Sequence, residues 1–149
     1  MKKLALLVAS VCYCGFSPFA PGTLASALAA VTLFYLPKVA IYLTPIIFIL
    51  GFVATQKVLE KTSEQDPSFI VIDEWAGMWV ALSFVPKTAA VYLLTFLLFR
   101  FLDITKPFPI NLMERIGGAL GVMLDDLVAG VIAGIGVGFV AQTLVFALK

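Results

Sequence analysis

The chain has 149 residues, of which 62% are hydrophobic and only 13% are charged. Its mean hydropathy is +1.08, whereas a soluble domain of this size would be about half apolar and about a quarter charged. We therefore expect one membrane-embedded domain over residues 1–149, with the bilayer as the partner of its apolar surface. The net charge of +1 and the absence of a basic stripe give no reason to expect nucleic-acid binding.

The first segment, MKKLALLVASVCYC at residues 1–14, is similar to a signal peptide because two lysines precede an apolar run. It contains no small-x-small cleavage site, so we expect an interfacial or partly inserted helix that stays in the protein. Cys12 and Cys14 are two residues apart and the chain has no histidine, which argues against a zinc site. We interpret both cysteines as small apolar side chains packed in a helix.

The rest of the chain contains long continuous apolar runs without alternation, which predict helices rather than strands. The expected helices lie at about 22–36, 39–56, 67–85, 88–103 and 120–148. Asp66 and Pro67 suit the N-cap and first position of the third helix, and the first helix is shorter than the ~20 residues of a usual span. The predicted fold class is therefore an all-α, polytopic membrane bundle of about four to five spanning or half-spanning helices.

The positions of lysine and arginine orient this bundle. With five spans, one face contains Lys2, Lys3, Lys57, Lys61, Lys106 and Arg115, with Arg100 nearby, and the other contains Lys38, Lys87 and Lys149. The positive-inside rule places the first face in the cytoplasm, although the orientation would reverse if residues 4–20 formed a span of their own. The loops at 17–23 and 103–109 and the aspartate pair at 125–126 then share a polar site on the cytoplasmic side.

Five carboxylates are expected to converge on that side: Asp73, Glu74, Asp103, Asp125 and Asp126. We expect the first two to lie about two turns into the 67–85 helix. A carboxylate at membrane depth costs several kcal/mol, so such residues usually face a bundle interior and indicate a functional site. Arg100 and Lys106 cannot neutralise five acids, so either some carboxyl groups are protonated or a metal cation balances them. Oxygen ligands favour Mg²⁺, Mn²⁺ or Ca²⁺, and of these we prefer Mg²⁺.

Neighbouring residues on a helix point about 100° apart. We therefore expect one member of each adjacent acid pair to bind metal, while the other supports it or a helix terminus. Two simpler interpretations stay open, because Asp103 could pair with Lys106 or Arg100, and Asp125 could cap the 120–148 helix.

Residue types and motifs that the sequence lacks exclude several phosphatase mechanisms. Without histidine, neither a phosphohistidine nor a histidine base is possible. Neither cysteine has an arginine six residues on, which excludes the loop of cysteine-based phosphatases. The residues after Asp103 do not form the Asp-x-Asp pair of aspartyl-phosphate phosphatases. If the protein acts on phosphate, metal-activated water or a carboxylate near a metal ion is what remains.

Two loops contain candidate phosphate-binding groups. Thr23 or Ser26 could cap the first turn of the 22–36 helix, whose free N–H groups would suit a phosphate; an ordinary capped helix is the alternative. Lys106 precedes Pro107, which disfavours helix, so we expect Lys106 in a loop. It is either a phosphate-binding ammonium or a lysine that extends to the membrane interface.

Glycines recur at every fourth position of the last helix, at Gly130, Gly134 and Gly138. This spacing predicts that another helix packs closely against it. Trp75 and Trp79 share one face of the 67–85 helix, and we expect them to contact lipid or a neighbouring helix.

Four stretches in this order resemble the bacterial phosphatidylglycerophosphatase A family. They are GFSPFAPGTLAS at 15–26, VIDEWAGMW at 71–79, FRFLDITKPFPI at 99–110 and GGALGVMLDDLVAGVIAG at 117–134. The resemblance implies a Mg²⁺-dependent, multi-pass enzyme of the bacterial inner membrane whose active site faces the cytoplasm. It would remove the terminal phosphate of a phospholipid substrate, phosphatidylglycerophosphate, to yield phosphatidylglycerol.

The resemblance also implies roles for individual residues. The five acids named above would bind metal; Asp73, Asp103, Asp125 and Asp126 would be catalytic; and Arg100, Lys106, Thr23 and Ser26 would bind substrate. Ala25 stands where the family often has glycine, and Glu114 where aspartate is common. A small cation carrier or channel with buried acidic ligands is the alternative, and a catalytically silent scaffold is a third possibility. Phosphate-binding groups argue against the carrier, since a cation path has no need of them.

Overall fold

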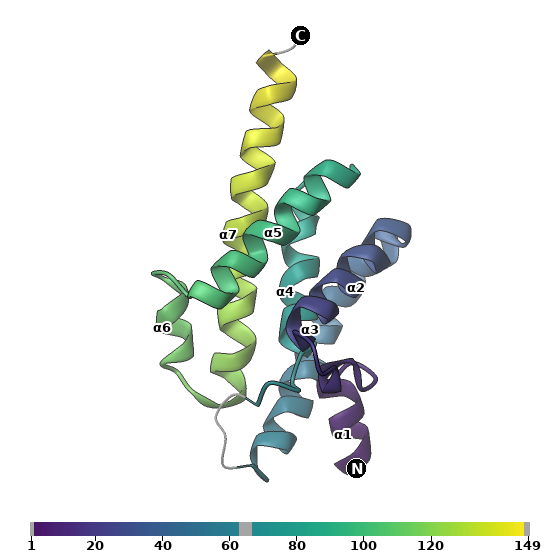
Figure 1. Cartoon of the computed structure of the whole chain (residues 1–149), viewed down its shortest axis with the longest axis vertical. Coiled ribbons are helices and arrows are strands. Elements are labelled where there is room, and N and C mark those ends of the chain that lie inside the picture. Colours follow the sequence, from purple (N-terminus) through teal and green to yellow (C-terminus); the bar gives the residue numbers. More distant parts are fainter. Residues whose placement is uncertain (1, 63–66, 148–149) are drawn as a thin grey trace.

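The computed structural model describes residues 2–62 and 67–147, and all regular structure within those ranges is helical. Its elements are α1 (Lys2–Ala9), the 3₁₀ helix η1 (Cys14–Phe16), α2 (Pro21–Tyr35), α3 (Pro37–Leu59), α4 (Ile72–Ser83), α5 (Ala89–Thr105), α6 (Ile110–Glu114) and α7 (Gly118–Ala147). The start of α1 and the end of α7 lie at opposite ends of the molecule (Figure 1). The prediction of an all-α fold is confirmed for the described residues.

Within the part of the chain that the structure describes, two helices are long and apolar enough to cross a membrane, through Tyr42–Leu59 of α3 and Gly118–Leu144 of α7. Large apolar side chains project outward from both, with Tyr42 79% and Phe139 72% exposed. Contiguous apolar surface of this kind is rare on soluble monomers, so we expect these faces to contact lipid. The number of spanning helices and their orientation stay predictions.

The helices α2, α3, α5 and α7 begin and end within three residues of the predicted ranges. The start of the 67–85 helix, however, was predicted wrongly, because α4 begins only at Ile72. Tertiary contacts hold the preceding residues out of the helix: the Val71 N–H donates to the Ala9 carbonyl at 2.9 Å, and the Phe69 carbonyl packs on Gly15, where a Cβ atom would lie 2.0 Å away. Asp66, the predicted N-cap, lies outside the described residues.

The later start of α4 moves two of the predicted site residues. Asp73 and Glu74 lie in the first turn of α4 instead of two turns inside a longer helix. Their side chains therefore sit beside the backbone N–H groups that a helix leaves unpaired at its start.

The N-terminal segment also differs from its prediction. The helix α1 ends at Ala9, and Val11, Cys12 and Tyr13 all have positive φ angles of 47°, 53° and 68°. The cysteines are therefore not packed in one helix: Cys12 lies in an exposed turn, and Cys14 opens η1. The short helix α6 was not predicted either.

The helix α4 lies at the centre of the bundle, where it packs against α2, α3, α5 and α7. Its side chains Met78, Trp79 and Leu82 are buried with Phe99 of α5. The Trp79 Nε1–H donates to the carbonyl oxygen of Ala29 in α2 at 2.9 Å, so this tryptophan contacts a neighbouring helix, as predicted. Hydrophobic packing and this buried hydrogen bond fix the position of α4.

Glycines allow α4 and α7 to touch through their backbones. A Cβ atom at Gly130 would lie 2.3 Å from the Gly77 carbonyl oxygen, and one at Gly134 would lie 2.4 Å from the Ala81 carbonyl oxygen. The predicted close packing along this glycine series is confirmed. A Cβ atom at Gly77 would lie 2.6 Å from the carbonyl oxygen of Asp126, so the same contact brings the acidic ends of the two helices together.

We expect Gly130→Ala to lower the melting temperature in detergent. The added methyl group overlaps backbone, and overpacking of this kind costs roughly 1–3 kcal/mol, more than the ~1 kcal/mol that alanine gains in helix propensity. The matched control is Gly136→Ala, because a Cβ atom there meets only Leu98 Cδ2, at 3.9 Å. The same melting temperature for both variants would contradict this packing.

Candidate functional site

One cavity of about 360 Å³ forms where the start of α2, the start of α4, the end of α5 and the second turn of α7 meet. Among the residues proposed above, it is lined by Thr23, Asp73, Glu74, Arg100, Asp103, Lys106, Asp125 and Asp126. Four segments distant in sequence thus bring together all five acids, both basic residues and the threonine. Ser26 does not line the cavity, whereas Ser68 and Ile70, which no sequence motif indicated, do.

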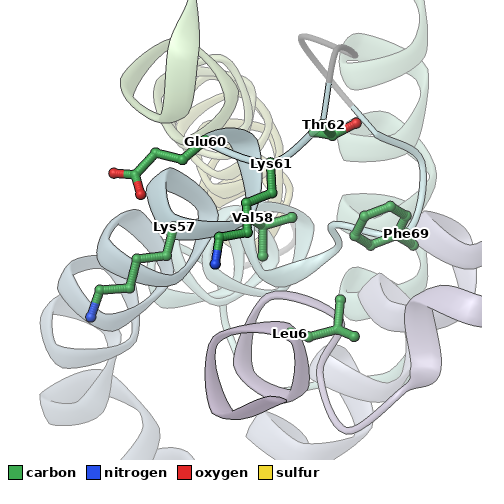
Figure 2. A pocket seen from close by; sticks show the side chains of 7 residues that line it. All are labelled: Leu6, Lys57, Val58, Glu60, Lys61, Thr62 and Phe69. Carbon is green, nitrogen blue, oxygen red and sulfur yellow. The ribbon is translucent and has the colours of Figure 1, made fainter. Parts of the chain in front are cut away.

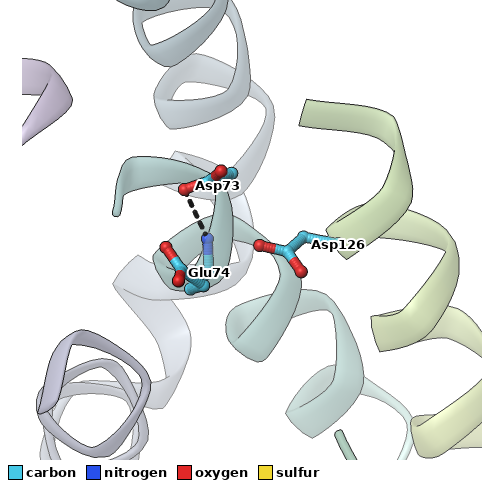
Figure 3. Close-up of side chains that lie close together, drawn as sticks. All are labelled: Asp73, Glu74 and Asp126. Atoms are coloured by element: carbon cyan, nitrogen blue, oxygen red, sulfur yellow. Dashed lines mark hydrogen bonds between the residues drawn. The ribbon is translucent and has the colours of Figure 1, made fainter. Parts of the chain in front are cut away.

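Three of the acids form a cluster between α4 and α7 (Figure 3). Asp73, Glu74 and Asp126 each offer one carboxylate oxygen, and these oxygens lie within 4.8 Å of one another. Asp73 is 6% exposed and Asp126 2% exposed. The backbone N–H of Glu74 donates to Asp73 Oδ1 at 3.0 Å. Three ionised carboxylates this close would repel strongly away from water.

Two oxygens of this cluster are buried without a hydrogen-bond partner among the residues that the structure describes. They are Glu74 Oε2 and Asp126 Oδ1. Buried polar atoms nearly always have a partner, because leaving one unpaired costs free energy. A hard divalent cation such as Mg²⁺ accepts carboxylate oxygen ligands and would serve as that partner. The donor set therefore fits the metal ion that the sequence indicates.

The two adjacent acid pairs behave differently. Asp125 turns away from the cluster toward Lys106, while Asp126 faces it, as expected for one member of a pair. Asp73 and Glu74 both contribute an oxygen, which the simple 100° argument did not predict. Asp125 also does not cap α7, because the helix already starts at Gly118.

Arg100 joins two of the acids to α2. Its Nη1 lies 2.5 Å from Asp103 Oδ2 and 3.7 Å from Glu74 Oε1, and it donates to Ser26 Oγ at 3.3 Å. The pairing of Asp103 with Arg100, left open by the sequence, is thus present. The fully buried Ser26 hydroxyl donates to the Gly22 carbonyl at 2.7 Å. Ser26 therefore does not cap α2, and it supports Arg100 from behind the cavity.

Lys106 is the C-cap of α5 and has a left-handed backbone, with φ 42°. The prediction that Lys106 lies in a loop beyond the helix is confirmed, because α5 ends at Thr105. Its Nζ lies 2.7 Å from Asp125 Oδ2 and 3.4 Å from Glu114 Oε1, and its side chain is 22% exposed. These contacts direct the ammonium group toward the cavity, not along the outer surface.

The start of α2 forms another wall of the cavity. The helix follows Ala20, which has a φ of 40°, and no side chain caps its first turn. Gly22 lines the cavity, and a Cβ atom there would lie 1.9 Å from Glu74 Oε1, so a side chain at this position would displace the Glu74 carboxylate. The first N–H groups of a helix have no intrahelical partners and attract anions. This turn therefore suits a phosphate group.

Acidic and basic groups line different parts of the cavity. The acid cluster occupies the side formed by α4 and α7, while Arg100, Lys106 and the start of α2 lie around it. The pKa of the Cys14 thiol is raised, mainly by burial and also by the negative charge of Glu74. A raised pKa disfavours the thiolate form, so Cys14 is a poor candidate for a nucleophile. The arrangement can hold a divalent cation next to a phosphate group.

Comparison with known proteins identifies the family of this chain. The family model for phosphatidylglycerophosphatase A matches residues 7–141. The chain is 38% identical over 126 residues to phosphatidylglycerophosphatase A of Escherichia coli, covering 80% of this chain and 73% of that protein. It is 38% identical over 121 residues to phosphatidylglycerophosphatase A of Haemophilus influenzae, with 76% and 74% covered.

A third relative, from Bacteroides thetaiotaomicron, is named a putative phosphatidylinositol-3-phosphatase. It is 39% identical over 128 residues, which cover 78% of this chain and 80% of that protein. No solved structure is significantly similar. All the residues that line the cavity lie within the matched region, and the chain belongs to the phosphatidylglycerophosphatase A family of phosphatases.

Proposed function

We propose that this protein hydrolyses the terminal phosphate of phosphatidylglycerophosphate, yielding phosphatidylglycerol and inorganic phosphate, with the help of a bound Mg²⁺ ion. One observation carries the proposal. The cavity contains two buried carboxylate oxygens that have no hydrogen-bond partner among the described residues, and it also contains Arg100, Lys106 and a helix start without a side-chain cap. A cation carrier would need the acids alone. The two relatives named phosphatidylglycerophosphatase A support the lipid substrate.

The acid cluster of Asp73, Glu74 and Asp126 would hold the ion. When bound, Mg²⁺ would neutralise phosphate charge and favour formation of a nucleophile from water. Asp103 lines the cavity beside the cluster and is a further candidate ligand, whereas Asp125 turns toward Lys106. The contacts of these two acids with Arg100 and Lys106 hold each phosphate-binding cation in place.

Arg100 and Lys106 would bind phosphate oxygens by charge-assisted hydrogen bonds, together with the first turn of α2. Either a water oxygen attacks phosphorus directly, or a carboxylate oxygen attacks first and water then cleaves the resulting acyl phosphate to release inorganic phosphate. In both routes the bond between phosphorus and the glycerol oxygen breaks. The leaving oxygen then takes a proton and stays with the lipid. Buried carboxylates that are not engaged with the ion are suitable groups to exchange these protons.

Phosphatidylinositol 3-phosphate is a second candidate substrate, because one relative is named for activity on that lipid. Both lipids present a phosphomonoester to the cavity. A glycerol phosphate is a narrow, flexible chain and needs less of the 360 Å³ than an inositol ring. We therefore favour phosphatidylglycerophosphate.

Phosphate release by the purified protein in detergent tests the proposed reaction. We expect release from phosphatidylglycerophosphate with Mg²⁺, loss of that activity on chelation, and slower release from phosphatidylinositol 3-phosphate with the same acyl chains. Faster release from the inositol lipid would overturn the choice of substrate. No release from either lipid at saturating Mg²⁺ would overturn the proposed activity.

Variants of two neighbouring aspartates can distinguish metal binding from phosphate binding. Asp126 supplies an unpartnered oxygen to the cluster, so Asp126→Asn should lose the rise in melting temperature that Mg²⁺ causes by binding the folded state. Its turnover should fall by about 10²-fold. Asp125→Asn is the matched variant, because Asp125 is also buried but contacts Lys106.

Asp125→Asn should lose turnover and still respond to Mg²⁺ in the melting experiment. A wild-type response to Mg²⁺ in Asp126→Asn would remove Asp126 from the metal site. Loss of the response in Asp125→Asn alone would exchange the roles of the two residues.

A further inference from the structure

A second cavity, of about 460 Å³, lies between α1 and the C-terminal end of α3. It is lined by the apolar side chains of Leu6, Val58 and Phe69 and by the charged side chains of Lys57, Glu60 and Lys61. Figure 2 shows Leu6 and Phe69 on one side of this cavity and the three charged side chains on the other. None of these residues lines the acidic cavity.

An apolar hollow of about 230 Å³ adjoins this cavity, since Lys57 lines both. It lies between Leu4 of α1 and Leu50 and Val53 of α3. These three apolar side chains are 65%, 54% and 41% exposed. The two hollows meet at Lys57, and together they are called here the α1–α3 groove, of which the smaller hollow is apolar apart from Lys57 and the larger one carries the charged side chains.

The candidate span in α3 would place this groove across the membrane boundary. The candidate span of α3 is Tyr42–Leu59, so Leu50 and Val53 lie within it, Lys57 in its last turn and Lys61 just beyond it. A rise of 1.5 Å per residue puts Lys57 roughly 10 Å from Leu50 along the helix axis. The apolar end of the groove therefore lies at the depth of acyl chains, and the lysines lie near the level of lipid headgroups.

The chemistry of the groove selects one kind of ligand. Among the described residues that line the groove, two ammonium groups stand against one carboxylate, and this balance favours an anionic headgroup, the opposite preference to that of the acid cluster. The exposed apolar end favours a ligand with an acyl chain, and lysine stems can pack along such a chain. We propose that the α1–α3 groove binds one anionic phospholipid of the bilayer, with its phosphodiester at Lys57 and Lys61 and an acyl chain between α1 and α3.

The groove shares a wall with the acidic cavity. Phe69 lines the groove, while its neighbours Ser68 and Ile70 line the acidic cavity. A lipid in the groove would pack against this wall and stabilise it. The proposal concerns a lipid that is not the substrate, so it stands or falls separately from the proposed reaction.

Phosphatidylserine is a suitable probe, because it is an anionic diester and is neither the proposed substrate nor the proposed product. Its affinity for the intact protein would be measured by native mass spectrometry in detergent. Phosphatidylcholine with the same chains tests the need for charge, and glycerophosphoserine tests the need for acyl chains. We expect phosphatidylserine to bind most tightly and glycerophosphoserine not to bind.

Lys57→Gln/Lys61→Gln should weaken phosphatidylserine binding by on the order of tenfold or more, given the usual contribution of a lysine near an anionic headgroup. Lys3→Gln/Arg115→Gln is the matched control, since both residues are exposed and neither lines the groove. It should bind as wild type does.

Val53→Trp, which fills the apolar end, should lose phosphatidylserine binding with both lysines present. If Val53→Trp does not fold, Leu50→Ser at its half-exposed position tests the same contact and should weaken binding.

Equal phosphatidylserine affinity in wild type and Lys57→Gln/Lys61→Gln would overturn the proposal. An equal loss in the control pair would also overturn it, because it would show general attraction between a basic face and anionic lipid. Tight binding of glycerophosphoserine would point to a soluble phosphate ligand instead. Unchanged binding in the folded apolar variants would exclude the acyl-chain contact.

Discussion

Five carboxylates share a cavity with two cationic side chains, and this imbalance of charge governs the structure around it. Like charges a few ångströms apart repel strongly when water is excluded. Holding them together requires rigid helices and a compensating cation or proton. The bundle supplies the rigidity: α4 is packed on four sides, and Gly77 and Gly130 bring its backbone against that of α7. Side chains at those two positions would separate the acids.

The five acids form two groups, one paired with cationic side chains and one gathered in the cluster. Asp103 pairs with Arg100, and Asp125 pairs with Lys106, while Asp73, Glu74 and Asp126 form the cluster. Arg100 also lies 3.7 Å from Glu74 Oε1. Both cations thus remain at the cavity although each is neutralised in part. A phosphate group carries its own negative charge, so its entry requires that a cation or bound protons offset the charge of the cluster, and we propose that a metal ion does so. The same argument joins cation binding to phosphate binding.

Much of this arrangement was predictable, because it depends on local patterns. Long apolar runs gave the boundaries of α2, α3, α5 and α7, and the four-residue glycine spacing predicted close packing on α7. Other features depend on distant contacts. The late start of α4 results from contacts of Val71 and Phe69 with the N-terminal segment. The position of Ser26 behind Arg100 requires α2 and α5 to be neighbours, which no local pattern encodes.

Metal-directed cleavage tests the central claim, that the acid cluster of α4 and α7 holds a divalent cation. Fe²⁺ would replace Mg²⁺ in the purified protein, and ascorbate with peroxide would then generate radicals that cut the nearby backbone. Mass spectrometry of the fragments locates the cuts. We predict cuts at the start of α4 around Asp73 and in α7 around Asp126, both suppressed by excess Mg²⁺. Cuts elsewhere, or cuts at these positions that Mg²⁺ does not suppress, would contradict the account.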